Sequence, residues 1–294
     1  MDSSMKAKRR RILDDIRRIC SVQVSLSANG ERIQFNPCYF EPLSPQIIRN
    51  HPITDPEWDQ VRPLNYYSEE DSEEDTEEDT EEDMEEDTED SGSESSDDIA
   101  RGSSIDIRDI DRAEIITEHL YGHLDASSRE GLLPFHQTLW DFSPFERGPT
   151  DKGRWRKDLY LHNDCMETSW RTSGVLEDTS YVFPHAVFYM HQDIRADNHG
   201  NLTICELKAI MRVMRIRISL KEYRQHLVLP VLILSFMGPQ HGRIIQAHHD
   251  GDNMIIQRSQ LFEIRDEETA PVELFLRYYL SQPVGLFTAT LCVR

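Results

Sequence analysis

Three residues in the C-terminal half have the types and spacing of a metal-dependent hydrolytic site. Asp193 precedes Glu206 and Lys208, and the latter two are separated by one residue. Two carboxylates can hold Mg²⁺, and a lysine beside the ion can help to activate a water molecule. The separation places the glutamate and lysine side chains on one face only if this segment is a β-strand.

This spacing resembles the Asp…Glu-x-Lys arrangement of the restriction-endonuclease-like fold. The resemblance implies a Mg-dependent nuclease-like enzyme with Asp193, Glu206 and Lys208 as its catalytic residues. The apolar positions favour another local structure, because apolar residues recur with a helical period over residues 207–218. The hypothesis therefore depends on whether residues 202–210 form a strand or a helix.

An overlapping segment resembles a degenerate EF-hand calcium loop. When the glycine that such loops require is matched, Asp197, Asn201 and Glu206 fall at ligand places. Arg195 occupies the first ligand place, where it brings a positive charge and no oxygen donor. The alternative is a turn that leads into a helix, which Thr203 and Glu206 would begin with a capping box.

Histidines gather around a predicted hairpin turn later in the chain. His248, His249 and Asp250 flank or join the Asp-Gly-Asp turn, and His241 lies just before the strand that leads to it. His248 and Asp250 would share a face of an extended strand, as two metal ligands can, whereas His249 would point the other way. Histidines on the surface of a sheet are the simpler interpretation, so no metal or cofactor is predicted here.

The charge of the chain is concentrated in one segment. Residues Glu69–Asp98 contain 20 acidic residues in 30 positions and no Lys, Arg or His. The whole chain has a net charge of −22, and without this segment 34 acidic residues face 32 basic ones. The segment also has almost no apolar residues, so it can bury too little surface to offset the entropy lost on ordering. The sequence therefore predicts a disordered acidic segment over residues 68–103.

The acidic segment also carries candidate phosphorylation sites. Six serines and threonines in this segment or next to it have an acidic residue three positions later, which resembles the substrate pattern of casein-kinase-type acidophilic kinases. Each phosphate would add about −1.5 to −2 charges. The candidate phosphoacceptors are Ser68, Ser72, Thr76, Thr80, Ser91 and Ser95.

A basic cluster near the N-terminus resembles a short nuclear-import signal. It consists of Lys6, Lys8, Arg9, Arg10 and Arg11. The same residues begin an amphipathic helix, so the cluster can also solvate a helix face, contact nucleic acid or lie against the acidic segment of the chain itself. These alternatives stay open at the level of the sequence.

The periodic segments predict an α+β fold with a mostly antiparallel sheet and packed helices. Residues 1–67 would form a basic helix and a β-hairpin segment, residues 68–103 an acidic linker, and residues 104–294 an α+β domain. Helices are expected over residues 6–20, 106–124, 202–218 and 271–280. Strands are expected over residues 21–36 (a hairpin around Asn29-Gly30), 181–190, 227–236, 242–249, 253–260 and 287–293.

The cysteines and the apolar runs indicate in which cellular compartment the protein is expected. Five widely spaced cysteines without a Cys-x-x-Cys pair favour a reducing environment over a disulfide scaffold. The longest apolar run, over residues 227–234, is far shorter than the roughly 20 residues of a membrane helix. We therefore expect an intracellular protein, nuclear or cytoplasmic, with no membrane partner.

Several motifs of the C-terminal half resemble uncharacterised proteins of filamentous ascomycete fungi. They are Leu202-Thr203 with Glu206-Leu207 and Met211, Pro230-Val231-Leu232, Ser235-Phe236-Met237-Gly238-Pro239-Gln240-His241, Asp250-Gly251, Pro271-Val272-Glu273-Leu274-Phe275 and Pro283-Val284-Gly285. The resemblance implies one domain over residues 181–293. That family has no established activity, so the resemblance implies no mechanism.

The function expected from the sequence is that of a non-enzymatic interaction module. Its acidic segment would contact basic protein partners, because opposite charges attract over a long range at moderate salt. Nucleic acid is an unlikely partner for this segment, since the phosphates would be repelled. The Mg-dependent nuclease and the calcium binder remain the alternatives.

Overall fold

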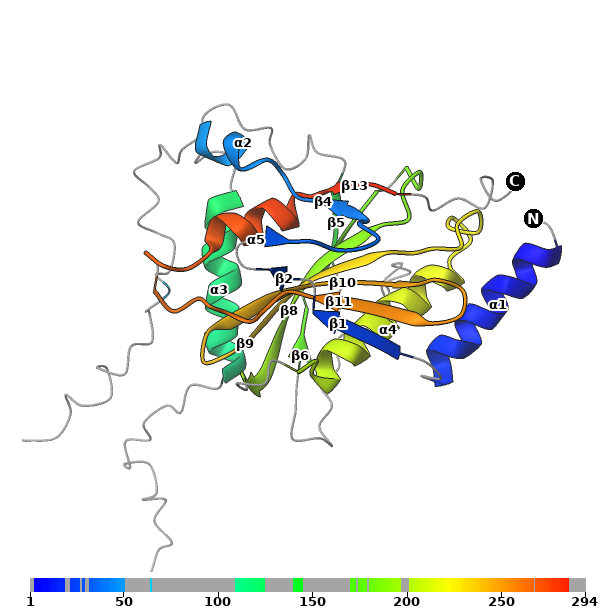
Figure 1. The fold of residues 1–294 in the computed structure, drawn as a ribbon, viewed down its shortest axis with the longest axis horizontal. Helices are drawn as coiled ribbons and strands as arrows, with labels where there is room; N and C mark the ends of the chain where they lie inside the picture. The colour runs from blue at the N-terminus through cyan, green and yellow to red at the C-terminus, as the bar shows by residue number, and fades with distance from the viewer. Residues whose placement is uncertain are drawn as a thin grey trace, which may run out of the picture.

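A computed structural model gives the arrangement of the chain (Figure 1). It describes residues 3–18, 22–26, 28–29, 32–50, 64, 109–124, 140–144, 170–172, 174–178, 180–196, 201–266 and 268–285. The acidic segment, the predicted final strand at residues 287–293 and all six candidate phosphoacceptors lie outside these residues.

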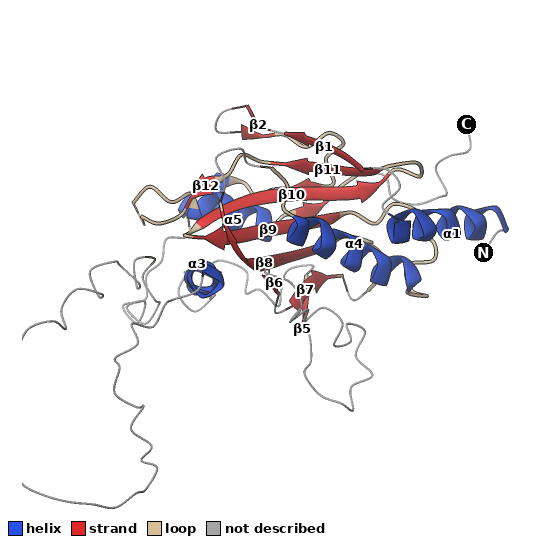
Figure 2. Cartoon of the chain, turned by 90° about the horizontal axis from the view of Figure 1, so that it is seen from below, coloured by secondary structure: helices blue, strands red, loops and turns tan. Residues whose placement is uncertain are grey.

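The centre of the fold is a nine-stranded sheet. Its main path runs β1-β11-β10-β9-β8-β7-β5, with β12 added to β10 and β6 added to β8. Figure 2 shows the central strands in this order. The strands are β1 (Val22–Leu26), β5 (Asp141–Pro144), β6 (Trp170–Arg171), β7 (Gly174–Glu177), β8 (Ala186–Arg195), β9 (Val231–Gly238), β10 (His241–His249), β11 (Met254–Arg258) and β12 (Phe262–Glu263).

The strand directions confirm the predicted fold class. Six of the pairings described in this sheet are antiparallel, whereas β1 with β11 and β8 with β9 are parallel. Two short pairs lie outside it, β2 (Ala28–Asn29) with β3 (Arg32–Ile33) and β4 (Phe40–Glu41) with β13 (Gln282–Pro283). With its helices the chain is α+β.

Helices pack on both sides of the sheet (Figure 1). One core contains α1 (Ser3–Arg18) and α4 (Ile204–Ser219), and the other contains α3 (Asp109–Leu124) and α5 (Val272–Tyr279). A short helix, α2 (Pro45–Asn50), lies against α5.

Strand β9 serves both cores, which explains its almost wholly apolar sequence. Val231 and Ile233 join the core under α4, and Leu232 and Leu234 join the core under α3. Successive side chains of a strand point to opposite faces, so a central strand covered on both faces is apolar at nearly every position.

The N-terminal hairpin prediction is wrong in its pairing. The segment predicted to pair with residues 33–35 is β1, which pairs in parallel with β11, from Val22 beside Met254 to Leu26 beside Arg258. A smaller hairpin remains between β2 and β3. An isolated two-stranded hairpin is marginally stable. When β1 joins the large sheet, its main-chain N–H and C=O groups can form hydrogen bonds with β11.

Residues of the first 67 positions thus belong to the same cores as the later domain. Ile12 and Ile16 of α1 join the core under α4, whereas Phe35 and Phe40 join the core under α3.

Strand β8 begins later than predicted, at Ala186 in place of Tyr181. Tyr181 has a positive φ of 60°, a value uncommon outside turns, and Pro184 lies between it and the strand. The strand then continues five residues beyond Met190, its predicted end.

Candidate functional site

Glu206, which both alternatives for a metal site require, lies in the first turn of α4. Thr203 caps this helix: its Oγ1 accepts a hydrogen bond from the Glu206 N–H at 3.1 Å, and a Glu206 carboxylate oxygen accepts one from the Thr203 N–H at 2.8 Å. This is the predicted capping box, and the helix expected over residues 202–218 is confirmed with bounds Ile204–Ser219.

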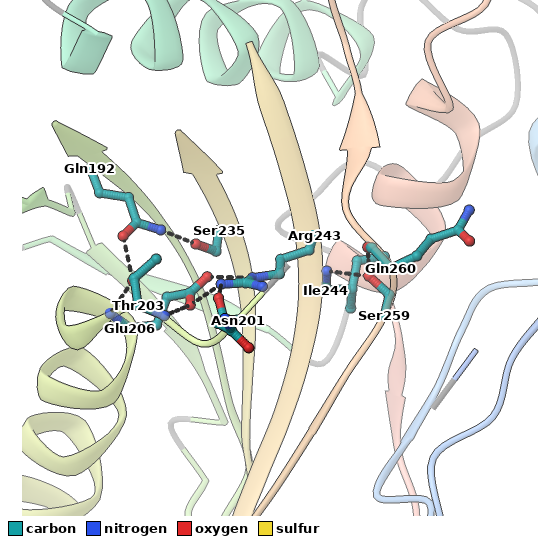
Figure 3. A network of polar contacts seen from close by, with 9 residues as sticks. All are labelled: Gln192, Asn201, Thr203, Glu206, Ser235, Arg243, Ile244, Ser259 and Gln260. Carbon is teal, nitrogen blue, oxygen red and sulfur yellow. Dashed lines mark hydrogen bonds and ion pairs between the residues drawn. The ribbon is translucent and has the colours of Figure 1, made fainter. Parts of the chain in front are cut away.

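Arg243 of β10 binds the carboxylate of Glu206 through two hydrogen bonds (Figure 3). Its Nε lies 2.7 Å from Oε1, and one of its terminal nitrogens lies 2.5 Å from Oε2. That nitrogen also donates to the carbonyl oxygen of Asn201 at 2.6 Å. The side chains of Glu206 and Arg243 are 0% and 1% exposed, so this is a buried, bidentate ion pair.

The polar network continues to two strands beside the helix start (Figure 3). The Thr203 hydroxyl donates to Gln192 Oε1 at 2.6 Å, and Gln192 Nε2 donates to Ser235 Oγ at 2.7 Å. Gln192 comes from β8 and Ser235 from β9. The network therefore connects the first turn of α4 to three strands, through Arg243 of β10, Gln192 of β8 and Ser235 of β9. Such a network is expected here, because buried polar groups need hydrogen-bond partners within the protein.

The nuclease hypothesis fails on this geometry. Glu206 and Lys208 lie on a helix, so they do not share the strand face that the motif requires. Asp193 turns to the opposite side of the sheet, where its carboxylate accepts a hydrogen bond from the Ile110 N–H at the start of α3. The three residues are therefore not brought together, and Glu206 already neutralises Arg243.

The calcium hypothesis fails for a related reason. Both carboxylate oxygens of Glu206 and the main-chain oxygen of Asn201 accept hydrogen bonds from Arg243, so these donors are engaged by a cation of the protein itself. Arg195, at the first place of the loop, pairs with Asp109 of α3 at 3.0 Å. Asp197 lies outside the described residues.

The basic cluster of α1 divides into an exposed part and a buried part. Lys6, Lys8, Arg10 and Arg11 are exposed, as a recognition signal must be. Arg9 is buried, and its guanidinium donates to the main-chain carbonyls of Ile218, Tyr223 and His226. It thereby caps the last turn of α4 and the turn beyond it, where carbonyls have no helical partner. Burial lowers the pKa of Arg9, and Arg224 adds to this effect.

The histidines of the β10–β11 hairpin point to opposite faces, as predicted. His248 packs its ring against Tyr39, with ring centroids 4.8 Å apart, whereas His249 faces Asp15 of α1 at 3.8 Å. Burial lowers the pKa of His248 to about 4. Within the described residues, no three His, Cys, Asp or Glu side chains group as a metal site would require.

Two other polar clusters join residues that are far apart in the sequence. Arg217 of α4 binds Glu177 of β7 at 3.0 Å with both side chains buried, and Tyr223 donates to the same carboxylate at 3.2 Å. On the other face, the hydroxyls of Tyr121 and Tyr189 lie 2.7 Å apart. The two tyrosines are among the residues that line an apolar pocket of about 10 Å³, which has room for about one water molecule.

Comparisons with protein-family models, with curated proteins and with solved structures found no match to this chain. The similarity to fungal proteins therefore remains an expectation from the sequence motifs. No helix in the part of the chain that the structure describes is long and apolar enough to cross a membrane.

Proposed function

We propose that this chain is a non-enzymatic interaction protein whose acidic segment, Glu69–Asp98, contacts basic protein surfaces. The observation that carries the proposal is the charge distribution: 20 acidic residues in 30 positions, on a chain that is otherwise close to neutral. Such a charge density attracts basic partners, increases their association rate and repels nucleic acid.

The surroundings of the candidate catalytic carboxylates support a binding role. Glu206 is held by Arg243, and Asp193 is held at the start of α3. Each thus has a structural partner that stabilises the fold. The acidic segment, in contrast, is set apart from the rest of the chain by its composition.

The test is a pull-down of purified histones by three forms of the chain. These are the full-length protein, a deletion of residues 69–98, and a full-length control in which the acidic residues of that segment become Gln or Asn. We expect capture by the full-length protein alone, and loss of capture at 1 M salt, where the screening length falls to about 3 Å. Equal capture by all three forms would assign the acidic segment to a spacer role.

Phosphorylation is proposed to strengthen this interaction. Treatment with an acidophilic kinase should raise the affinity for histones through the added negative charge. A variant with Ser72, Thr76 and Thr80 replaced by Ala should lose this increase while it keeps the affinity of the unmodified protein. An increase that survives these substitutions would exclude these three sites as its cause.

The exposed part of the basic cluster is proposed as a nuclear-import signal of an intracellular protein. Replacement of Lys6, Lys8 and Arg10 by Ala should shift the protein from the nucleus to the cytoplasm, and Arg9 must be kept because it contacts α4. The same variant tests the alternative in which the acidic segment of the chain binds the basic helix α1 and covers it. Increased histone capture by the variant would indicate that the two segments compete.

A further inference from the structure

Two histidines of α3 stand one helical turn apart and face each other. His119 and His123 have i,i+4 spacing, which places two side chains on one side of a helix. Their Nε2 atoms lie 3.1 Å apart, with ring centroids 4.8 Å apart and ring planes at 64°. The two nitrogens that can bind a metal thus lie at hydrogen-bonding distance from each other.

The separation of the two nitrogens fits a shared metal ion. Two Zn–N bonds of about 2.0–2.1 Å, with an angle of about 100–110° at the metal, place the two nitrogens roughly 3.1–3.4 Å apart. Two histidines at i and i+4 of a helix are also the pair that helical zinc motifs use. The observed 3.1 Å lies within this range.

The site is held on a rigid support. Ile116 and Leu120, on the same helix, are buried in the core between α3 and the sheet. His119 is only 6% exposed, whereas His123 is half-buried, so the pair is anchored at one end and open to solvent at the other. A pre-positioned pair loses little conformational freedom when it binds an ion.

We propose that His119 and His123 form a two-histidine site for a divalent transition-metal ion of the zinc, nickel and copper class. Imidazole nitrogen suits these ions, whereas Mg²⁺ and Ca²⁺ prefer oxygen ligands. Without metal, one ring donates its Nε2 proton to the other ring. To bind the ion, that ring carries the proton on Nδ1, so that both Nε2 lone pairs face the metal.

Within the described residues no third His, Cys, Asp or Glu completes the set. Water would fill the coordination positions for which the described residues supply no ligand. Such a site is an exchangeable one, with a lower affinity than a four-ligand structural zinc site. The inference does not depend on the acidic segment or on its partners.

The test is calorimetric titration of the full-length protein with Ni²⁺ and, separately, with Zn²⁺. His123→Ala removes the more exposed ligand, and His241→Ala removes one histidine elsewhere as a matched control. We expect the affinity of one saturable site to fall at least about tenfold in His123→Ala, because even the loss of a group that only supports a ligand costs 10- to 100-fold. The control should bind as the unchanged protein does.

A second measurement separates metal binding from folding. Ni²⁺ should raise the melting temperature of the unchanged protein and of His241→Ala, but not that of His123→Ala, because a ligand that binds only the folded state stabilises it. Circular dichroism without metal must show His123→Ala folded for the comparison to hold, and His119→Ala gives an independent repeat. Affinity and thermal shift that are the same in His123→Ala and the unchanged protein would overturn the proposal.

Discussion

Arg243 of β10 holds both carboxylate oxygens of Glu206, the residue that also closes the capping box of α4. One side chain therefore joins a helix start to the middle of the sheet. The pair is buried, so each charge depends on the other for its stabilisation.

Breaking this pair should destabilise the fold strongly. We expect Arg243→Met to lower the free energy of unfolding by about 3–5 kcal/mol, because it leaves a buried carboxylate without its partner. The double variant Glu206→Gln with Arg243→Met should lose less than the sum of the two single variants. Urea unfolding followed by circular dichroism measures all three, and strict additivity would contradict the coupling.

The matched control is an exposed ion pair. Arg11 and Asp252 lie 2.9 Å apart with side chains 67% and 73% exposed. Such pairs contribute about 0–1 kcal/mol. Asp252→Ala should therefore change the free energy of unfolding by no more than about 1 kcal/mol in the same urea experiment.

Arg9 and Arg10 should differ sharply although they are neighbours in one basic cluster. Arg9→Ala removes hydrogen bonds to the main-chain carbonyls of Ile218, Tyr223 and His226. We expect a loss of at least about 1.5–3 kcal/mol, the contribution of one hydrogen bond to a charged group. Arg10→Ala, at an exposed position, should change stability by less than about 0.5 kcal/mol. Equal melting temperatures for the two variants would show that Arg9 does not cap α4.

The protein should lose stability as the pH falls from neutral to mildly acidic. Burial lowers the pKa of His185 and of His191 to about 3 and that of His248 to about 4. Below an unfolded pKa of about 6.5 the unfolded chain takes up protons that the folded chain does not, so stability is complete above pH 6.5 and declines below it.

His248→Phe should reduce this dependence. Phenylalanine can keep a ring against Tyr39 and has no titrating group, so the slope between pH 6 and 4.5 should fall by up to about 1.4 kcal/mol per pH unit. Urea unfolding at several pH values measures the slope. An unchanged slope would mean that His248 takes up its proton equally in both states.

Deletion of Glu69–Asp98 should leave the melting temperature nearly unchanged. The segment has Met84 as its one large apolar residue, so it has little to bury against the domain. A change of more than about 5 °C, which corresponds to roughly 1–2 kcal/mol for a domain of this size, would show that it packs on the fold. Differential scanning calorimetry at low and at high salt makes the comparison.

Local patterns predicted the local structure well. Thr203 and Glu206 indicated the start of α4, and the apolar period that follows indicated its length. The turn at Asp250 likewise predicted the β10–β11 hairpin, because both strands and their connection are close in the sequence.

Contacts between residues far apart in the sequence could not be predicted from local patterns. The sequence left Glu206 open as an alternative metal ligand, because nothing local shows that Arg243, 37 positions later, neutralises it. Periodicity likewise identifies Val22–Leu26 as a strand but carries no information about which strand it joins. The spacing of His119 and His123 was visible in the sequence, and a search for i,i+4 histidines within the predicted helix would have found it.

The contacts of Arg9 constrain the order in which the molecule can assemble on a ribosome. This residue is synthesised well before its acceptor at His226, which follows 217 positions later. At about 5–20 residues per second, the interval is on the order of ten to forty seconds. During that time the first helix has neither its carbonyl acceptors nor its sheet. The N-terminal segment is therefore a late-docking part of the fold, and a nascent-chain chaperone would meet it unpaired.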